Sequence, residues 1–138
     1  MGLTLLDAGV LIGFLDSGDA HHHAARRALA EAQARGDRIV IAASAFAEAL
    51  VGPSRAGAGA VSAVQDFADR LPLGVAALDA DIAVVAARLR ARHDAKLKLP
   101  DALVVATAVH LLADVLLTTD RGWPAKSALG FRGHLVKL

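Results

Sequence analysis

The sequence predicts an α/β fold built around a central, mostly parallel sheet of four to five strands. Short apolar runs, such as residues 39–42, alternate with longer Ala- and Leu-rich segments of helical period. This alternation is typical of strand–helix units around a parallel sheet. The length of 138 residues suits one domain, and 55 % hydrophobic residues can form a packed core. We therefore expect residues 1–138 to form a single domain.

The composition excludes several kinds of site and location. There is no cysteine, which excludes disulfides and thiolate metal sites. The first residues lack the basic start and apolar core of a signal peptide. No apolar run reaches the roughly 18 to 20 residues that cross a bilayer. We expect a soluble, cytoplasmic protein without a membrane partner.

Apolar runs and capping residues predict the order of the elements. The predicted strands are 3–6, 39–42, 73–76, 115–118 and, at the edge, 135–137. The predicted helices are 8–15, 20–35, 44–51, 60–71, 80–92 and 100–112. Asp19, Ser44 and Asp79 are expected to cap three of them. Gly52-Pro53 is expected to stop the helix that begins at Ser44.

Four acidic residues follow strands or lie on the helices that approach the same edge of the sheet. Asp7 directly follows the first predicted strand, and Asp120 follows the fourth. Glu48 lies on the helix after the second strand, and Asp101 lies in the first turn of its helix. Ligands of open α/β sheets bind beyond the carboxyl ends of the strands. We therefore expect these four carboxylates to share one rim of the sheet.

Three of these acids also have a purely structural interpretation. Asp7 could cap the first helix, Asp101 suits the positive end of a helix dipole, and Asp120 could be a turn residue. Glu48 is harder to explain in this way, because it lies among apolar neighbours, where an unpaired carboxylate is costly.

Together, the four acids point to a divalent cation. Crowded carboxylates repel one another and raise one another's pKa, and a cation relieves that repulsion. Hard oxygen ligands suit Mg²⁺ or Mn²⁺, which can assist water in cleaving a phosphodiester. Thr118 would share a strand face with Asp120. Without binding the metal itself, its hydroxyl could orient a carboxylate or a water that does. An ordinary strand-end threonine is the alternative.

Basic residues gather shortly before Asp101, although the net charge of +1 does not itself indicate nucleic-acid binding. This cluster consists of Arg88, Arg90, Arg92, Lys96 and Lys98. It could hold RNA phosphates beside the acids, or it could be a solvated helix face.

Three segments resemble the motifs of PIN domains and come in the order in which that family carries them. Residues 5–12 (LLDAGVLI) resemble the opening strand and first acid of the family, and residues 99–108 (LPDALVVATA) resemble the segment that carries its third acid. Residues 116–123 (LLTTDRGW) resemble the closing motif of the family. Glu48 matches the second acid by its position. The resemblance covers essentially the whole chain and implies a PIN-like three-layer α/β/α sandwich.

The length of the chain, without an attached domain, further resembles the VapC toxins of bacterial toxin–antitoxin pairs. This resemblance implies a homodimeric, Mg²⁺- or Mn²⁺-dependent endoribonuclease that cuts structured RNA, often transfer or ribosomal RNA. It also implies inhibition by a cognate VapB antitoxin, whose tail covers the acidic site. Carried over by position, the metal-binding catalytic residues would be Asp7, Glu48, Asp101 and Asp120.

The closing motif departs from the family in one place. Many relatives have another acidic or amide residue shortly after the closing Asp, where this chain has Arg121 and Gly122. We therefore expect one well-held ion rather than two. Arg121 could contact an RNA phosphate or pair with an acid of the cluster, and the sequence does not choose between these roles.

Two other features carry weaker signals. Adjacent residues of a helix point in different directions, so the run 21–23 (HHH) makes a poor metal site and is expected at a solvated or RNA-facing edge. Trp123, the only tryptophan, is expected in the core or an interface rather than as a base-stacking platform. The chain has no tyrosine and four phenylalanines, so recognition of RNA shape is favoured over reading of unpaired bases.

Three other functions fit parts of the sequence. A phosphatase with an aspartyl nucleophile usually has a second Asp two residues after the first, where this chain has Gly9. A catalytically silent PIN fold could bind RNA or a protein without cleavage, although the retention of all four acids argues against it. A free-standing PIN nuclease of RNA maturation would have the same acids and no antitoxin.

Overall fold

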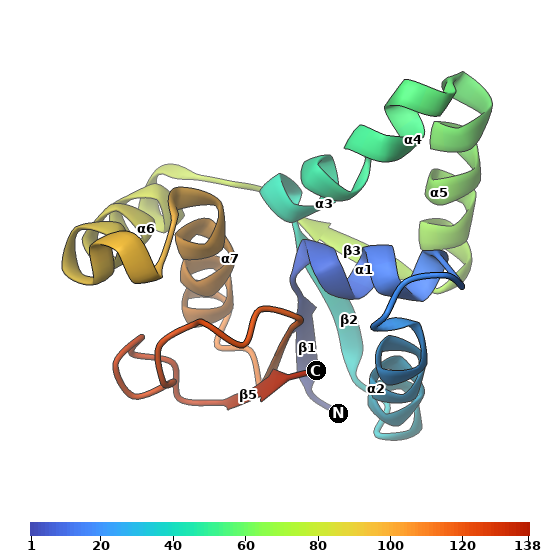
Figure 1. Ribbon diagram of the computed structural model, residues 1–138. Helices are drawn as coiled ribbons and strands as arrows, with labels where there is room; N and C mark the ends of the chain where they lie inside the picture. The colour runs from blue at the N-terminus through green and yellow to red at the C-terminus, as the bar shows by residue number, and fades with distance from the viewer.

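The computed structural model describes residues 1–138 and contains one five-stranded sheet with helices on both sides (Figure 1). The strands are β1 (Leu3–Leu6), β2 (Arg38–Ala42), β3 (Leu73–Ala76), β4 (Val115–Thr118) and β5 (His134–Lys137). Their order in the sheet is β3-β2-β1-β4-β5, and every neighbouring pair is parallel. The predicted three-layer α/β/α architecture is confirmed, with all five strands parallel.

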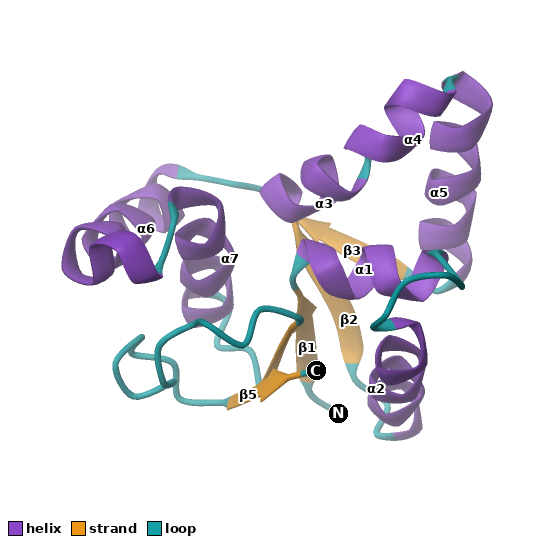
Figure 2. Ribbon diagram, in the orientation of Figure 1, coloured by secondary structure: helices purple, strands orange, loops and turns teal.

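Seven α-helices form the outer layers. They are α1 (Ala8–Leu15), α2 (His22–Ala34), α3 (Ala43–Ala49), α4 (Val51–Ala56), α5 (Ala58–Arg70), α6 (Ala80–His93) and α7 (Leu99–His110). A short 3₁₀ turn, η1 (Asp94–Lys96), joins α6 to α7, which pack against each other on one side of the molecule (Figure 2). Helices α1, α2 and α5 lie on the other side. None of the helices is both long and apolar enough to span a membrane.

The strand register aligns the carboxyl ends of the central strands. Leu6 of β1 is level with Ile41 of β2 and with Leu117 of β4. The Asp7 N–H donates a hydrogen bond to the Leu117 carbonyl oxygen at 2.9 Å, so the chain leaves β1 beside the end of β4. Residues that follow β1 and β4 therefore start from the same rim of the sheet.

The core lies on both faces of this sheet. Leu5, Leu6 and Leu116 are completely buried, because the central strands are covered by helices on each side. Trp123 and Phe131, from the long segment between β4 and β5, also join the core. The prediction that Trp123 is a core residue is confirmed.

Three expectations about helix ends are wrong. Ser44 does not cap α3, whose N-cap is Ala42, and lies instead inside the first turn of that helix. Gly52-Pro53 does not end the helical region but lies in the first turn of α4, where proline is tolerated because its missing N–H has no helical partner. Asp19 does not cap α2, whose N-cap is His21. The Asp19 carboxylate instead accepts the His21 N–H at 2.8 Å in the preceding turn. Asp79 caps α6 as predicted, accepting the Ile82 N–H at 2.9 Å.

Candidate active site

Asp7 lies at the junction between β1 and α1 and is 7 % exposed. It is the N-cap of α1, and its Oδ1 accepts the Ala8 N–H at 2.8 Å. Its Oδ2 accepts the Thr118 hydroxyl at 2.8 Å. Burial raises the pKa of Asp7. The hydrogen bonds from Thr118 and Ala8 oppose this rise, whereas the charges of Glu48 and Asp120 add to it. Asp7 thus caps a helix and also faces the acidic cluster.

Thr118 connects two of the predicted site residues. Its hydroxyl donates to Asp7 and accepts the Asp120 N–H at 3.0 Å. The Asp120 Oδ1 in turn accepts the Gly122 N–H at 2.8 Å, which closes a tight turn after β4. The end of β4 therefore fixes Asp7 and the backbone of Asp120 relative to each other.

Asp101 lies in the first turn of α7, directly after the proline of that turn. The side chain is half-buried. Burial raises its pKa to about 6, and the charges of Asp7, Asp120 and Glu48 contribute to the rise. The fold therefore brings together four carboxylates that are far apart in the sequence.

Glu48 differs from the expectation drawn from its neighbours. We expected a carboxylate within an apolar setting, but Glu48 is exposed, because α3 turns this residue toward solvent while Ala45 and Ala49 face the core. Asp120 is exposed as well. The cluster therefore has a buried side, formed by Asp7 and Asp101, and a solvent side, formed by Glu48 and Asp120.

The donor chemistry of this cluster fits a hard divalent cation. All four groups are carboxylates, and their mutual repulsion contributes to the raised pKa of Asp7 and Asp101 after the larger effect of burial. No three of the His, Asp and Glu side chains converge tightly enough to hold an ion as they stand. Mg²⁺ usually keeps several waters and uses only one or two carboxylates, so it does not need a closed cage of side chains.

Trp123 contributes a group that the sequence analysis did not place at the site. Its side chain is buried, and its indole N–H is the one buried side-chain polar group without a hydrogen-bond partner. The N–H nevertheless lies near enough to Asp101 to oppose the rise in pKa that burial and the other acids cause. The position of Trp123 three residues after Asp120 was the only signal available in the sequence.

Gly9 allows α1 to approach the end of β4. A Cβ atom at this position would overlap the Thr119 hydroxyl oxygen. The first turn of α1, which carries Asp7 at its cap, therefore lies directly against the strand end that carries Thr118 and Asp120.

The predicted RNA-binding residues lie on several elements. Arg88 and Arg92 are one helical turn apart on α6 and exposed, whereas Arg90 is directed differently and pairs with Asp94 at 3.0 Å. Lys96 lies in η1, and Lys98 is the N-cap of α7, three residues before Asp101.

Arg121 contacts the end of the chain rather than an acid of the cluster. Its Nε donates to the Leu138 carbonyl oxygen at 3.3 Å, and it forms no ion pair with an acid of the cluster.

The histidine run forms no cluster of three side chains that could hold a metal ion. His22 contacts the Gly13 carbonyl oxygen at 2.8 Å, which ties the start of α2 to α1.

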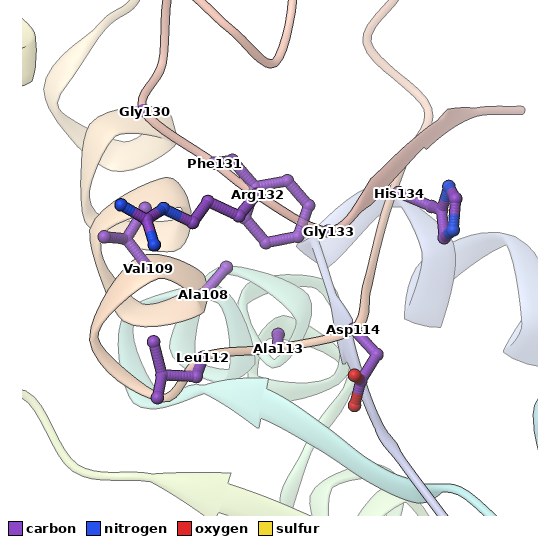
Figure 3. A pocket seen from close by; sticks show the side chains of 10 residues that line it. All are labelled: Ala108, Val109, Leu112, Ala113, Asp114, Gly130, Phe131, Arg132, Gly133 and His134. Carbon is purple, nitrogen blue, oxygen red and sulfur yellow. The ribbon is translucent and has the colours of Figure 1, made fainter.

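A cavity of about 680 Å³ lies away from the acids. It is lined by Asp114 and His134, which lie at the amino ends of β4 and β5, and by Leu112, Phe131 and Arg132 (Figure 3). Asp120 lies beyond the opposite end of β4. Glu48 and Asp120 are exposed, so the acidic cluster forms an open rim of the sheet.

Comparison with known families decides the classification. Residues 4–129 match the family model of the PIN domain. The chain belongs to the PIN-domain family. No sequence among the curated proteins matches this PIN domain.

Several solved structures share the fold of this PIN domain at low sequence identity. VapBC-1 from nontypeable Haemophilus influenzae has a TM-score of 0.72 and 15 % identity, with 98 % of this chain and 97 % of that chain covered. VapBC2 from Rickettsia felis, bound to a DNA fragment from its promoter, has a TM-score of 0.69, 18 % identity and coverages of 99 % and 98 %. Mycobacterium tuberculosis VapC20, a sarcin-ricin loop cleaving toxin, has a TM-score of 0.69, 23 % identity and coverages of 93 % and 95 %.

Proposed function

We propose that this PIN domain is an Mg²⁺- or Mn²⁺-dependent endoribonuclease and the toxin of a VapBC-type toxin–antitoxin pair. The observation that carries the proposal is the shared rim of Asp7, Glu48, Asp101 and Asp120. Burial and mutual repulsion raise the pKa of Asp7 and Asp101, so both side chains have more to gain from a cation than isolated surface acids have.

The four carboxylates would hold the ion with different degrees of preorganisation. Asp7 is fixed by hydrogen bonds to both oxygens, whereas Asp120 has only Oδ1 engaged, by the Gly122 N–H. When bound, Mg²⁺ or Mn²⁺ would supply positive charge to the scissile phosphodiester and to the attacking water. Asp101 must be ionised to take part, so the proton that it holds near pH 6 must leave first.

An open rim suits a folded RNA better than a small molecule. Glu48 and Asp120 are exposed, and the cluster is not enclosed by the large cavity at the other end of the sheet. The exposed cations Arg88, Arg92 and Lys98 precede Asp101 along the chain and would contact the RNA backbone. Hydrolysis by an activated water needs no protein nucleophile.

The toxin role and its partners rest on similarity. Relatives of this fold include VapBC proteins, and the resemblance of the three motifs implies a VapB-type antitoxin, a homodimer and a cytoplasmic location. A free-standing PIN nuclease would share the acids without the antitoxin. A short reading frame directly upstream, whose product binds this protein and blocks cleavage, would distinguish the toxin from that alternative.

The decisive experiment is cleavage of total cellular RNA by the purified protein. We expect discrete products with Mg²⁺ or Mn²⁺, and none with EDTA or with Asp7→Asn. RNA binding without products would instead identify a catalytically silent PIN fold. Products that persist in Asp7→Asn would contradict the four-carboxylate mechanism.

A further inference from the structure

The indole of Trp123 is held firmly in the loop that follows β4. On one side, the tight turn closed by Asp120 and Gly122 precedes it. On the other side, Lys137 of β5 donates to the Trp123 carbonyl oxygen at 2.6 Å. The ring is 3 % exposed and belongs to the hydrophobic core. Its position is therefore set by the fold and does not depend on a ligand.

The indole N–H has no partner in spite of this fixed position. It is the single buried side-chain polar group in the chain that makes no hydrogen bond. Buried donors in folded proteins are nearly always paired, and an unpaired one is costly. Because the unpaired Trp123 N–H lies next to the acidic cluster, we look for an acceptor that it reaches when the cluster changes its arrangement.

Asp101 is the acceptor within reach. Burial raises the pKa of its carboxyl, as do the other three acids, and the Trp123 N–H is the one neighbour that acts in the opposite direction. The half-buried Asp101 can turn about its side-chain torsions, whereas the indole in the core cannot. A small rotation of the carboxylate would pair the buried N–H.

We propose that Trp123 is a positioning residue whose indole N–H donates to one oxygen of the Asp101 carboxylate when the acidic rim holds its cation. The other oxygen of Asp101 then faces the ion. This arrangement extends to Asp101 the kind of orientation that Thr118 gives to Asp7. Groups that orient metal ligands in this way commonly change metal affinity about 10- to 100-fold when removed. The inference rests on the proposed metal site.

The chain offers a direct spectroscopic test, because Trp123 is its only tryptophan. A ¹⁵N-labelled sample gives one indole N–H signal, which reports on this group alone. We expect addition of Mg²⁺ to the wild type to move the indole proton downfield, as a new hydrogen bond does. In Asp101→Ala, which lacks both the acceptor and one proposed ligand of the cation, Mg²⁺ should leave the signal in place. An indole signal that does not move in the wild type at saturating Mg²⁺ would overturn the inference.

Metal affinity provides a second test that does not depend on RNA cleavage. Growth on 3-benzothienylalanine replaces the N–H of Trp123 by sulfur and keeps the ring shape, whereas Trp123→Phe changes the packing too. We expect both proteins to bind Mn²⁺ about 10- to 100-fold more weakly than the wild type in a calorimetric titration. Phe131→Leu, a buried aromatic of the same loop segment, is the packing control and should bind Mn²⁺ normally.

The outcomes separate this inference from the proposed function. A benzothienylalanine protein that binds Mn²⁺ as tightly as the wild type would overturn the role of Trp123 and leave the nuclease standing. A wild-type protein that binds no Mn²⁺ would overturn both. Weaker Mn²⁺ binding in the benzothienylalanine protein, with a melting temperature like that of the wild type, would support the positioning role.

Discussion

The Thr118 hydroxyl donates a hydrogen bond of 2.8 Å to Asp7 and accepts one of 3.0 Å from the Asp120 N–H. One side chain at the end of β4 thus orients the buried acid that follows β1 and anchors the turn that carries an exposed acid. This contact joins two strands at the rim where the four carboxylates meet.

Replacement of Thr118 tests this connection. Thr118→Val keeps the shape and removes the hydroxyl, so we expect RNA cleavage to fall about 10- to 100-fold. The free energy of unfolding should fall by about 1–3 kcal/mol, because the Asp120 N–H and an Asp7 oxygen lose their buried partner. Thr118→Ser keeps the hydroxyl and should retain most of the cleavage. Equal rates in the Val and Ser variants, measured on the same RNA, would assign Thr118 no part in orienting Asp7.

The acids themselves make a stronger prediction. Asp7→Asn or Asp101→Asn should abolish cleavage and leave the circular dichroism spectrum unchanged, because the amide keeps the shape and loses the charge. Asp66→Asn, an exposed acid of α5, is the matched control and should cleave RNA normally. Wild-type rates in either of the first two variants would remove that residue from the mechanism.

The pKa of Asp101 predicts a dependence of stability on pH. Its pKa is about 6 in the folded protein against 3.8 for an ordinary aspartate, so the folded state binds more protons between these values. The free energy of unfolding should therefore fall as pH rises from about 4 to about 6. Asp101→Asn should lose this part of the dependence and be about 1 kcal/mol more stable than the wild type at pH 7, a value reduced because solvent screens the half-buried group. Urea unfolding without metal at several pH values measures both effects, and parallel curves for the two proteins would contradict the assignment.

Cation binding should restore the stability that the ionised Asp101 costs the protein at neutral pH. Mg²⁺ that binds only the folded state raises the melting temperature increasingly as its concentration exceeds the dissociation constant. We expect a rise with Mg²⁺ concentration in the wild type and a much smaller one in Asp7→Asn. Scanning calorimetry measures both melting temperatures. The same increase in both proteins would place the ion elsewhere.

Gly9 predicts a steric effect on the same rim. In Gly9→Ala the new methyl group overlaps the Thr119 hydroxyl, so the Thr119 side chain, α1 or the chain after β4 must shift, and we expect a loss of about 1–3 kcal/mol in the free energy of unfolding. Gly52→Ala in α4 is the control, because nothing lies within 4 Å of the added Cβ. That variant should gain about 0.4–1 kcal/mol. Chemical unfolding of both variants measures the contrast, and a Gly9→Ala protein as stable as the wild type would show that the contact yields freely.

The basic residues of α6 predict the response of RNA binding to salt. Arg88→Gln/Arg92→Gln removes two exposed charges and should weaken binding and reduce the slope of log affinity against log salt. Arg90→Gln should have a smaller effect, because Asp94 already pairs with that guanidinium. Filter binding from low to moderate salt with a catalytically inactive protein measures the slopes. An unchanged slope in the double variant would make this helix face an ordinary solvated surface.

The sequence by itself determined the fold class, the five strands and the rim to which the acids belong. Parallel strands end at one edge of the sheet, so acids placed after Leu6 and Thr118 must start from that edge. The PIN motifs could be recognised for the same reason, since they are local segments at strand ends and helix starts. Helix boundaries near Asp19 and Gly52-Pro53 were less determined, because turn residues there fit more than one local structure.

Only the tertiary structure decided how each acid is surrounded. The apolar neighbours of Glu48 in the sequence face the core, while Glu48 itself faces solvent, because the rotation of α3 is set by packing. The approach of the Trp123 indole to Asp101 and the hydrogen bond from Thr118 to Asp7 both join segments far apart in the chain. Burial and charge at a site depend on such long-range contacts, which local residue patterns do not specify.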